Sequence, residues 1–141
     1  MMTIPARPRA EALQFNSAAT TDIGRVRDTN EDAFLLHDVG HFWVVADGMG
    51  GHASGQVASK LAVEHIADFM LRWRLEPTNC WPFDIDESVS LNESTVVTAI
   101  QVANLRIYNR SQVDQECEGM GTTVVLLRYD DADGLAIPKI S

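Results

Sequence analysis

The sequence is poor in cysteine and in long apolar runs. Its two cysteines, Cys80 and Cys117, lie far apart and belong to no CxxC pair, so neither a zinc site nor a disulfide framework is indicated. No apolar run is long enough to span a bilayer, and residues 1–10 lack the apolar core of a signal peptide. We therefore expect a soluble, cytoplasmic protein with reduced thiols.

Positive charge is also scarce. The 141 residues include 11 Lys and Arg but 20 Asp and Glu, which gives a formal net charge of −9. This surplus repels nucleic acid phosphates and anionic lipids, so we expect neither nucleic acid nor a membrane as a partner. The hydrophobic fraction of 45% is enough for one core. We predict a loose segment over residues 1–15 and one domain over residues 16–141.

The order of apolar patterns predicts a mixed α+β domain. Residues 16–24 contain Thr and Ile before a glycine, which favours a short strand. Residues 33–37 and 42–46 are apolar runs joined by a glycine-containing turn, which is typical of a β-hairpin. Apolar residues then recur every three or four positions over residues 55–73 and about 93–108, which predicts two amphipathic helices.

The last third of the chain returns to strand patterns. Residues 122–127 (TTVVLL) predict a buried strand, residues 130–134 a turn, and residues 135–137 a brief strand. Because the helices stand between two groups of strands, we predict an antiparallel sheet that the helix pair covers on one face.

The strongest local motif is VADGMGGHASG, residues 45–55. A buried strand ends on Asp47 and continues into glycines, which places a carboxylate at a sheet edge beside a backbone that is free to fold around a ligand. Carboxylate and carbonyl oxygens suit Mg²⁺ or Mn²⁺. A plain Asp-Gly turn is the alternative. A nucleotide-phosphate loop is a weaker one, because no Gly-Lys-Ser/Thr or GxGxxG pattern is present.

Two further motifs flank this one. In residues 27–32 (RDTNED), Arg27 offers a planar fork for phosphate oxygens, while Glu31 and Asp32 could hold metal-bound water. A solvated loop is the alternative. Residues 118–123 (EGMGTT) place glycines before a buried strand, which favours a tight turn that packs closely against another backbone.

The motifs RxxNED (27–32), VADGMGGHxxG (45–55) and GMGTT (119–123) together resemble the metal-dependent protein phosphatases, the type 2C serine/threonine phosphatases, in their bacterial form. The resembling stretch runs from about residue 20 to residue 127. The resemblance implies the N-terminal portion of an α-β-β-α layered sandwich. It also implies a centre with two Mg²⁺ or Mn²⁺ ions, where a bridging water attacks a phosphoserine or phosphothreonine of a substrate protein.

The same resemblance implies roles for individual residues. Asp47 is similar to the carboxylate that bridges both metals, Gly48 to the backbone carbonyl ligand, and Arg27 to the phosphate-holding arginine. Glu31 and Asp32 are similar to the acidic pair near the metals.

His52 is a candidate proton donor to the leaving alkoxide, and a structural role is its alternative. The animal enzymes of the family carry their histidine directly after the Asp-Gly pair, whereas here Met49, Gly50 and Gly51 stand between.

The resemblance ends near Ile137, before the Gly-Asp-Ser-Arg motif and the later aspartate motifs of the family. We therefore expect an impaired or inactive fragment, with a non-catalytic phosphopeptide- or protein-binding module as the alternative. Unpaired sheet edges are expected to favour self-association. The acids of residues 130–134 (DDADG) do not match a calcium loop and are expected to form a hairpin turn.

Overall fold

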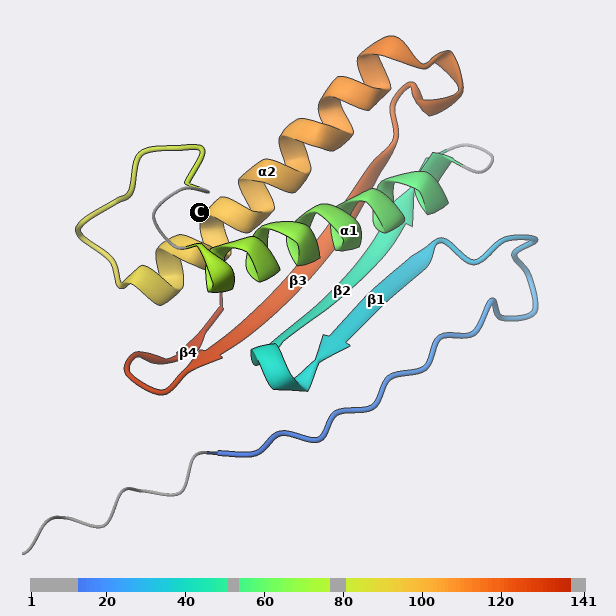
Figure 1. Cartoon of the computed structure of the whole chain (residues 1–141). Coiled ribbons are helices and arrows are strands. Elements are labelled where there is room, and N and C mark those ends of the chain that lie inside the picture. Colours follow the sequence, from blue (N-terminus) through green and yellow to red (C-terminus); the bar gives the residue numbers. More distant parts are fainter. Residues whose placement is uncertain (1–12, 51–53, 77–80, 138–141) are drawn as a thin grey trace, which may run out of the picture.

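The computed structural model describes residues 13–50, 54–76 and 81–137. In chain order the elements are β1 (Asp32–His37), η1 (Asp38–Gly40), β2 (Phe42–Met49), α1 (Ser54–Leu75), α2 (Leu91–Val113), η2 (Gln115–Cys117), β3 (Gly121–Asp130) and β4 (Gly134–Ala136). The strands form one antiparallel sheet in the order β1-β2-β3-β4. Both helices lie across one face of this sheet (Figure 1). The predicted helix pair on an antiparallel sheet is confirmed.

The core lies between the helices and the sheet. Because side chains alternate along a strand, every second residue of β2 points toward the helices. The main buried cluster consists of Phe42, Val44, Ile66, Phe69, Met70, Val96, Ala99, Ala103, Leu126 and Ala136. A second cluster contains the small residues Ala46, Ala58 and Ala62, all fully buried. These alanines let the first half of α1 lie close to the end of β2.

The start of α2 is fixed by a capping box. The Ser90 hydroxyl accepts a hydrogen bond from the Glu93 amide at 3.1 Å, and the Glu93 carboxylate accepts one from the Ser90 amide at 3.3 Å. These bonds satisfy amide groups that the first helical turn leaves without partners. The helix therefore begins at Leu91, slightly earlier than its apolar pattern predicts.

The strand predicted over residues 16–24 is wrong, because the first strand of the described chain is β1. Polar side chains attach this segment to the sheet instead of a backbone ladder: Ser17 donates to Asp38, and Thr21 donates to Asp32. Phe15, just before it, packs with ring centroids 5.0 Å from Trp43 and 5.1 Å from Tyr129. Thr and Ile content alone does not reveal whether a neighbouring strand is available for a segment to pair with.

β2 extends beyond its predicted end. The apolar run stops at residue 46, but the strand continues to Met49 because Asp47, Gly48 and Met49 pair with Thr123, Thr122 and Gly121 of β3. Asp47 therefore lies inside a paired strand and not at its end. Cross-strand pairing overrides the poor strand propensity of Asp and Gly here.

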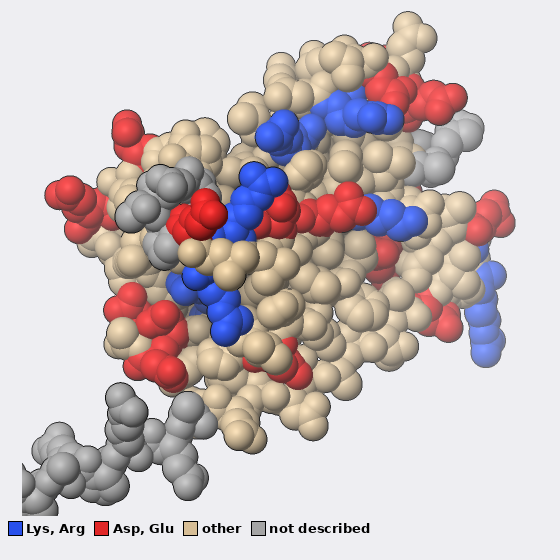
Figure 2. All heavy atoms as spheres, in the orientation of Figure 1, with Lys and Arg blue, Asp and Glu red and all other residues tan. Residues whose placement is uncertain are grey.

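The two sides of the molecule differ in surface character. Figure 2 shows the helix-covered side, where acidic and basic side chains are interspersed. The helices carry the ion pairs Arg72–Asp68 at 3.0 Å, on α1, and Arg110–Asp114 at 2.8 Å, at the end of α2. In the described parts of the chain, no helix combines the length and apolar character required to cross a membrane.

The face of the sheet turned away from the helices carries an apolar row. Phe34 pairs with Val45, and Val45 pairs with Val125, so their side chains lie side by side across three strands. They are 37%, 50% and 64% exposed. We call the face that bears this row the open face.

Candidate functional site

Two predicted site residues meet on the open face. Asp32 is the first residue of β1 and is the cross-strand partner of Asp47 on β2, which in turn is the partner of Thr123 on β3. Directly opposed residues of antiparallel strands project from the same side. All three are exposed. Two like charges in this relation oppose folding unless a cation lies between them, so the arrangement favours a binding role.

Glu31 has different surroundings from its neighbour Asp32. Its side chain is only 14% exposed and forms an ion pair with Arg27 at 3.5 Å, whereas Arg27 is 64% exposed. Its carboxylate also lies at the first turn of α1. The approach is so close that a Cβ added at Gly55 would come within 2.4 Å of Glu31 Oε1. The positive N-terminal end of a helix favours such a carboxylate. Glu31 thus links the predicted phosphate-binding arginine to α1.

Close packing explains why glycine occupies positions 48 and 55 of the 45–55 motif. A Cβ on Gly48 would lie 2.0 Å from the Gly55 carbonyl oxygen and 2.9 Å from that of Glu31. The Gly48 amide donates to the Glu31 carbonyl at 3.0 Å. The start of α1 therefore approaches the β2 backbone too closely for any side chain at Gly48. The sequence pattern suggested a flexible ligand loop, but at Gly48 and Gly55 the structure shows tight contacts.

Sequence reasoning missed two hydroxyl residues at this edge. Thr123 lies beside Asp47, and its hydroxyl donates to the Asp47 carbonyl at 3.4 Å. Thr21 donates to the Asp32 carboxylate at 2.6 Å. Thr123 could have been found from the two-residue period of its strand once the pairing with β2 was assumed. No sequence signal brings Thr21 to Asp32.

His52 lies outside the described residues, together with Gly51 and Ala53, and its role stays a prediction. Within residues 13–50, 54–76 and 81–137, no group of three or more His, Cys, Asp or Glu side chains is placed to hold a metal ion. Asp32 and Asp47 fit Mg²⁺ or Mn²⁺ in kind, since both offer exposed oxygen donors. They would supply only part of a coordination shell.

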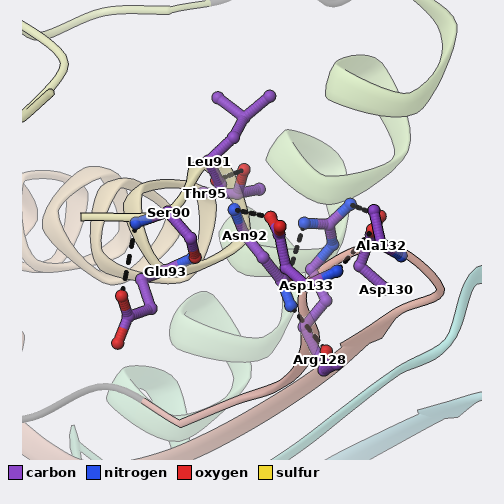
Figure 3. A network of polar contacts seen from close by, with 10 residues as sticks. Ser90, Leu91, Asn92, Glu93, Thr95, Arg128, Asp130, Ala132 and Asp133 are labelled. Atoms are coloured by element: carbon purple, nitrogen blue, oxygen red, sulfur yellow. Dashed lines mark hydrogen bonds and ion pairs between the residues drawn. The ribbon is translucent and has the colours of Figure 1, made fainter.

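The acids of residues 130–134 lie at the opposite end of the sheet and form the predicted hairpin turn. Figure 3 shows their network: the Arg128 guanidinium donates to the Asn92 side chain and pairs with Asp130 at 3.6 Å, and Asn92 donates to the Gly134 carbonyl at 2.8 Å. Burial lowers the pKa of Arg128, and the nearby acids partly oppose this shift. Asn92, whose backbone amide also donates to the Asp133 carboxylate at 3.4 Å, thus joins α2 to the turn.

Comparison with known proteins agrees with the three motifs. The sequence profile of the family described as protein phosphatase 2C matches residues 24–140. A serine/threonine phosphatase, stp, from Listeria monocytogenes is 36% identical over 108 residues, which cover 74% of this chain and 39% of that protein. The chain therefore spans about two fifths of the length of that relative.

Solved structures show the same partial coverage. The serine/threonine phosphatase PstP of Mycobacterium tuberculosis superposes with a TM-score of 0.62 and 31% identity, over 81% of this chain and 42% of that one. A PstP catalytic domain in complex with two manganese ions gives a TM-score of 0.62 and 30% identity, over 80% and 42% of the two chains. The fold, the motifs and these relatives lead to one conclusion: the chain belongs to the protein phosphatase 2C family.

Proposed function

We propose that this chain takes part in the metal-dependent dephosphorylation of phosphoserine or phosphothreonine in proteins. Asp47 and Asp32 would provide part of the edge that binds two Mg²⁺ or Mn²⁺ ions. The observation that carries the proposal is the cross-strand pair of exposed carboxylates on the open face. Membership of the family and the manganese-bound relative support it.

The residues around the pair have separate proposed tasks. Asp47 and the Gly48 carbonyl would hold metal, and Asp32 would bind it directly or through water. The exposed Arg27 would bind phosphoryl oxygens while Glu31 holds its position. His52 would donate a proton to the leaving serine or threonine oxygen. When bound, the ions would activate water and neutralise charge on the phosphoryl group.

The test is Mn²⁺-dependent phosphate release from a phosphothreonine peptide. We expect Asp47→Asn to abolish release, and Arg27→Lys to raise KM about 10-fold because the bidentate fork is lost. Asp131→Asn, in the exposed turn at the far end of the sheet, is the matched control and should act as the unsubstituted chain does. Release that survives Asp47→Asn would contradict the proposed activity. No release from the folded chain would agree with the impaired fragment expected from the sequence, and Mn²⁺ titration would then test metal binding by Asp47 and Asp32 separately.

The open face supports a second proposal, that another β-layer covers it. The row Phe34, Val45 and Val125 is apolar and exposed, and β1 and β4 form the edges of the described sheet. A second copy of the chain is one such layer, so we expect self-association at raised concentration. Sedimentation should show less association for Val45→Lys than for Val113→Lys, which adds a charge at an exposed site on α2. Equal association of the two variants would refute this role of the open face.

A further inference from the structure

The segment before β1 contacts the proposed metal-binding end of the sheet through one side chain, that of Thr21. Its Phe15 and Ser17 contact the sheet near Trp43 and Asp38, and Thr21 then comes beside Asp32. Figure 1 shows this part of the chain as an extended trace alongside the sheet, without a ladder. Ser17 and Thr21 are thus two separate polar attachments of one segment, and only Thr21 touches a proposed metal-binding residue.

The contact between Thr21 and Asp32 is part of a directed chain of hydrogen bonds. The Asn30 side-chain amide donates to Thr21 Oγ1 at 3.0 Å, and Thr21 Oγ1 is 2.6 Å from Asp32 Oδ2. The Asp32 amide in turn donates to the Asn30 side-chain oxygen at 3.0 Å. A hydroxyl has one proton, and its short contact to a carboxylate is the stronger use of it. Thr21 therefore accepts from Asn30 and donates to Asp32.

These hydrogen bonds fix one oxygen of the exposed Asp32 carboxylate. Without an anchor, Asp32 would turn away from the like charge of Asp47, its cross-strand partner. A donor on Oδ2 holds the side chain in one orientation. In metal sites generally, removing such a supporting hydrogen bond lowers metal affinity by about 10-fold to 100-fold.

We infer that Thr21 is a positioning residue, whose hydroxyl holds the Asp32 carboxylate beside Asp47 in the orientation that accepts a divalent cation. The inference rests on the proposed metal-binding function. It differs from a simple tethering role, because Ser17 and Phe15 attach the same segment without touching Asp32. The contact is exposed to solvent, so its loss should affect metal affinity far more than the unfolding midpoint.

The test compares four forms of the chain: unsubstituted, Thr21→Val, Thr21→Ser and Ser17→Ala. Valine keeps the shape of threonine without the hydroxyl, serine restores the hydroxyl, and Ser17→Ala weakens the other attachment. Without metal, the three-bond couplings between Hα and Hβ of Asp32 report its χ1 rotamer by NMR. We expect one rotamer in all forms except Thr21→Val, where the couplings should show averaging.

Mn²⁺ titration of the same samples supplies the second measurement. Thr21→Val should raise the dissociation constant about 10-fold, while Thr21→Ser and Ser17→Ala should leave it unchanged. An averaged Asp32 rotamer in the unsubstituted chain, a fixed one in Thr21→Val, or an equal loss of affinity in Ser17→Ala would overturn the inference. If the unsubstituted chain bound no Mn²⁺ at this edge, the proposed metal-binding function would fail, and the metal-free couplings would still decide whether Thr21 positions Asp32.

Discussion

At the end of the sheet where β1 begins, two exposed like charges, Asp32 and Asp47, lie opposite each other, whereas at the other end Asp38 and Arg128 each have complementary partners. There, Asp38 accepts hydrogen bonds from Ser17 and from the Trp43 indole, and Arg128 donates to the buried Asn92. These polar groups stabilise the fold, and their hydrogen-bond partners lie within the protein. The carboxylate pair costs stability, and we attribute its presence to ligand binding.

The largest effect should come from disturbing the packing of α1 against β2, at the end of the sheet that carries Asp32 and Asp47. Gly48→Ala would place a Cβ 2.0 Å from the Gly55 carbonyl, a backbone atom that cannot turn aside. We expect a loss of about 3 kcal/mol or more in the free energy of unfolding, measured in urea. Gly121→Ala is the control, since its Cβ would meet only the Met49 side chain, with Cγ at 3.4 Å and Sδ at 3.8 Å. Similar losses in both variants would refute the close approach of α1.

Breaking the hydrogen-bond network around Asn92, at the opposite end of the sheet, should destabilise the protein. Asn92 is 1% exposed, and Asn92→Leu would leave the Arg128 guanidinium and the Gly134 carbonyl without this partner. We expect a destabilisation of about 2 kcal/mol by urea unfolding. Asn104→Leu, on the exposed side of α2, should change stability by less than about 0.5 kcal/mol. A neutral Asn92→Leu would mean that the network does not support the fold.

A smaller effect should appear on acidification. Hydrogen bonds from the Ser17 hydroxyl, the Trp43 indole and the Ser17 amide lower the pKa of Asp38. Because the unfolded value is about 3.9, these bonds add stability above roughly pH 4 that is lost as the pH falls through the folded-state pKa. Asp38→Asn should therefore flatten the fall in stability between about pH 5 and pH 3. Ser17→Ala should flatten it partly, and parallel curves for all three proteins would contradict the assignment.

Much of the fold follows from apolar periodicity. Both helices, the hairpin of β1 and β2, and the β3–β4 turn could be predicted because each is encoded within a short stretch of sequence. The extension of β2 through Asp47 could not, because it depends on pairing with β3, which lies far along the chain. The strand expected over residues 16–24 failed for the same reason, since composition does not reveal a missing ladder partner.

The candidate site shows the same division between local and long-range information. Motif spacing identified Asp47 and the acidic pair, but only the strand register places Asp32 opposite Asp47, and only the packing of α1 places Glu31 beside Gly55. The support of Asp32 by Thr21 depends on a segment held by side chains, and side-chain contacts of this kind leave no periodic signal.

The most direct test of the central claim is a comparison of Asp47→Asn with the unsubstituted chain in thermal unfolding, with and without Mn²⁺. We expect Mn²⁺ to raise the Tm of the unsubstituted chain and of the Asp131→Asn control, but not that of Asp47→Asn. With EDTA, Asp47→Asn should be at least as stable as the unsubstituted chain, because a like-charge pair is removed. Equal stabilisation of Asp47→Asn by Mn²⁺, or a loss of its stability in EDTA, would contradict the claim that the carboxylate pair is kept for a cation.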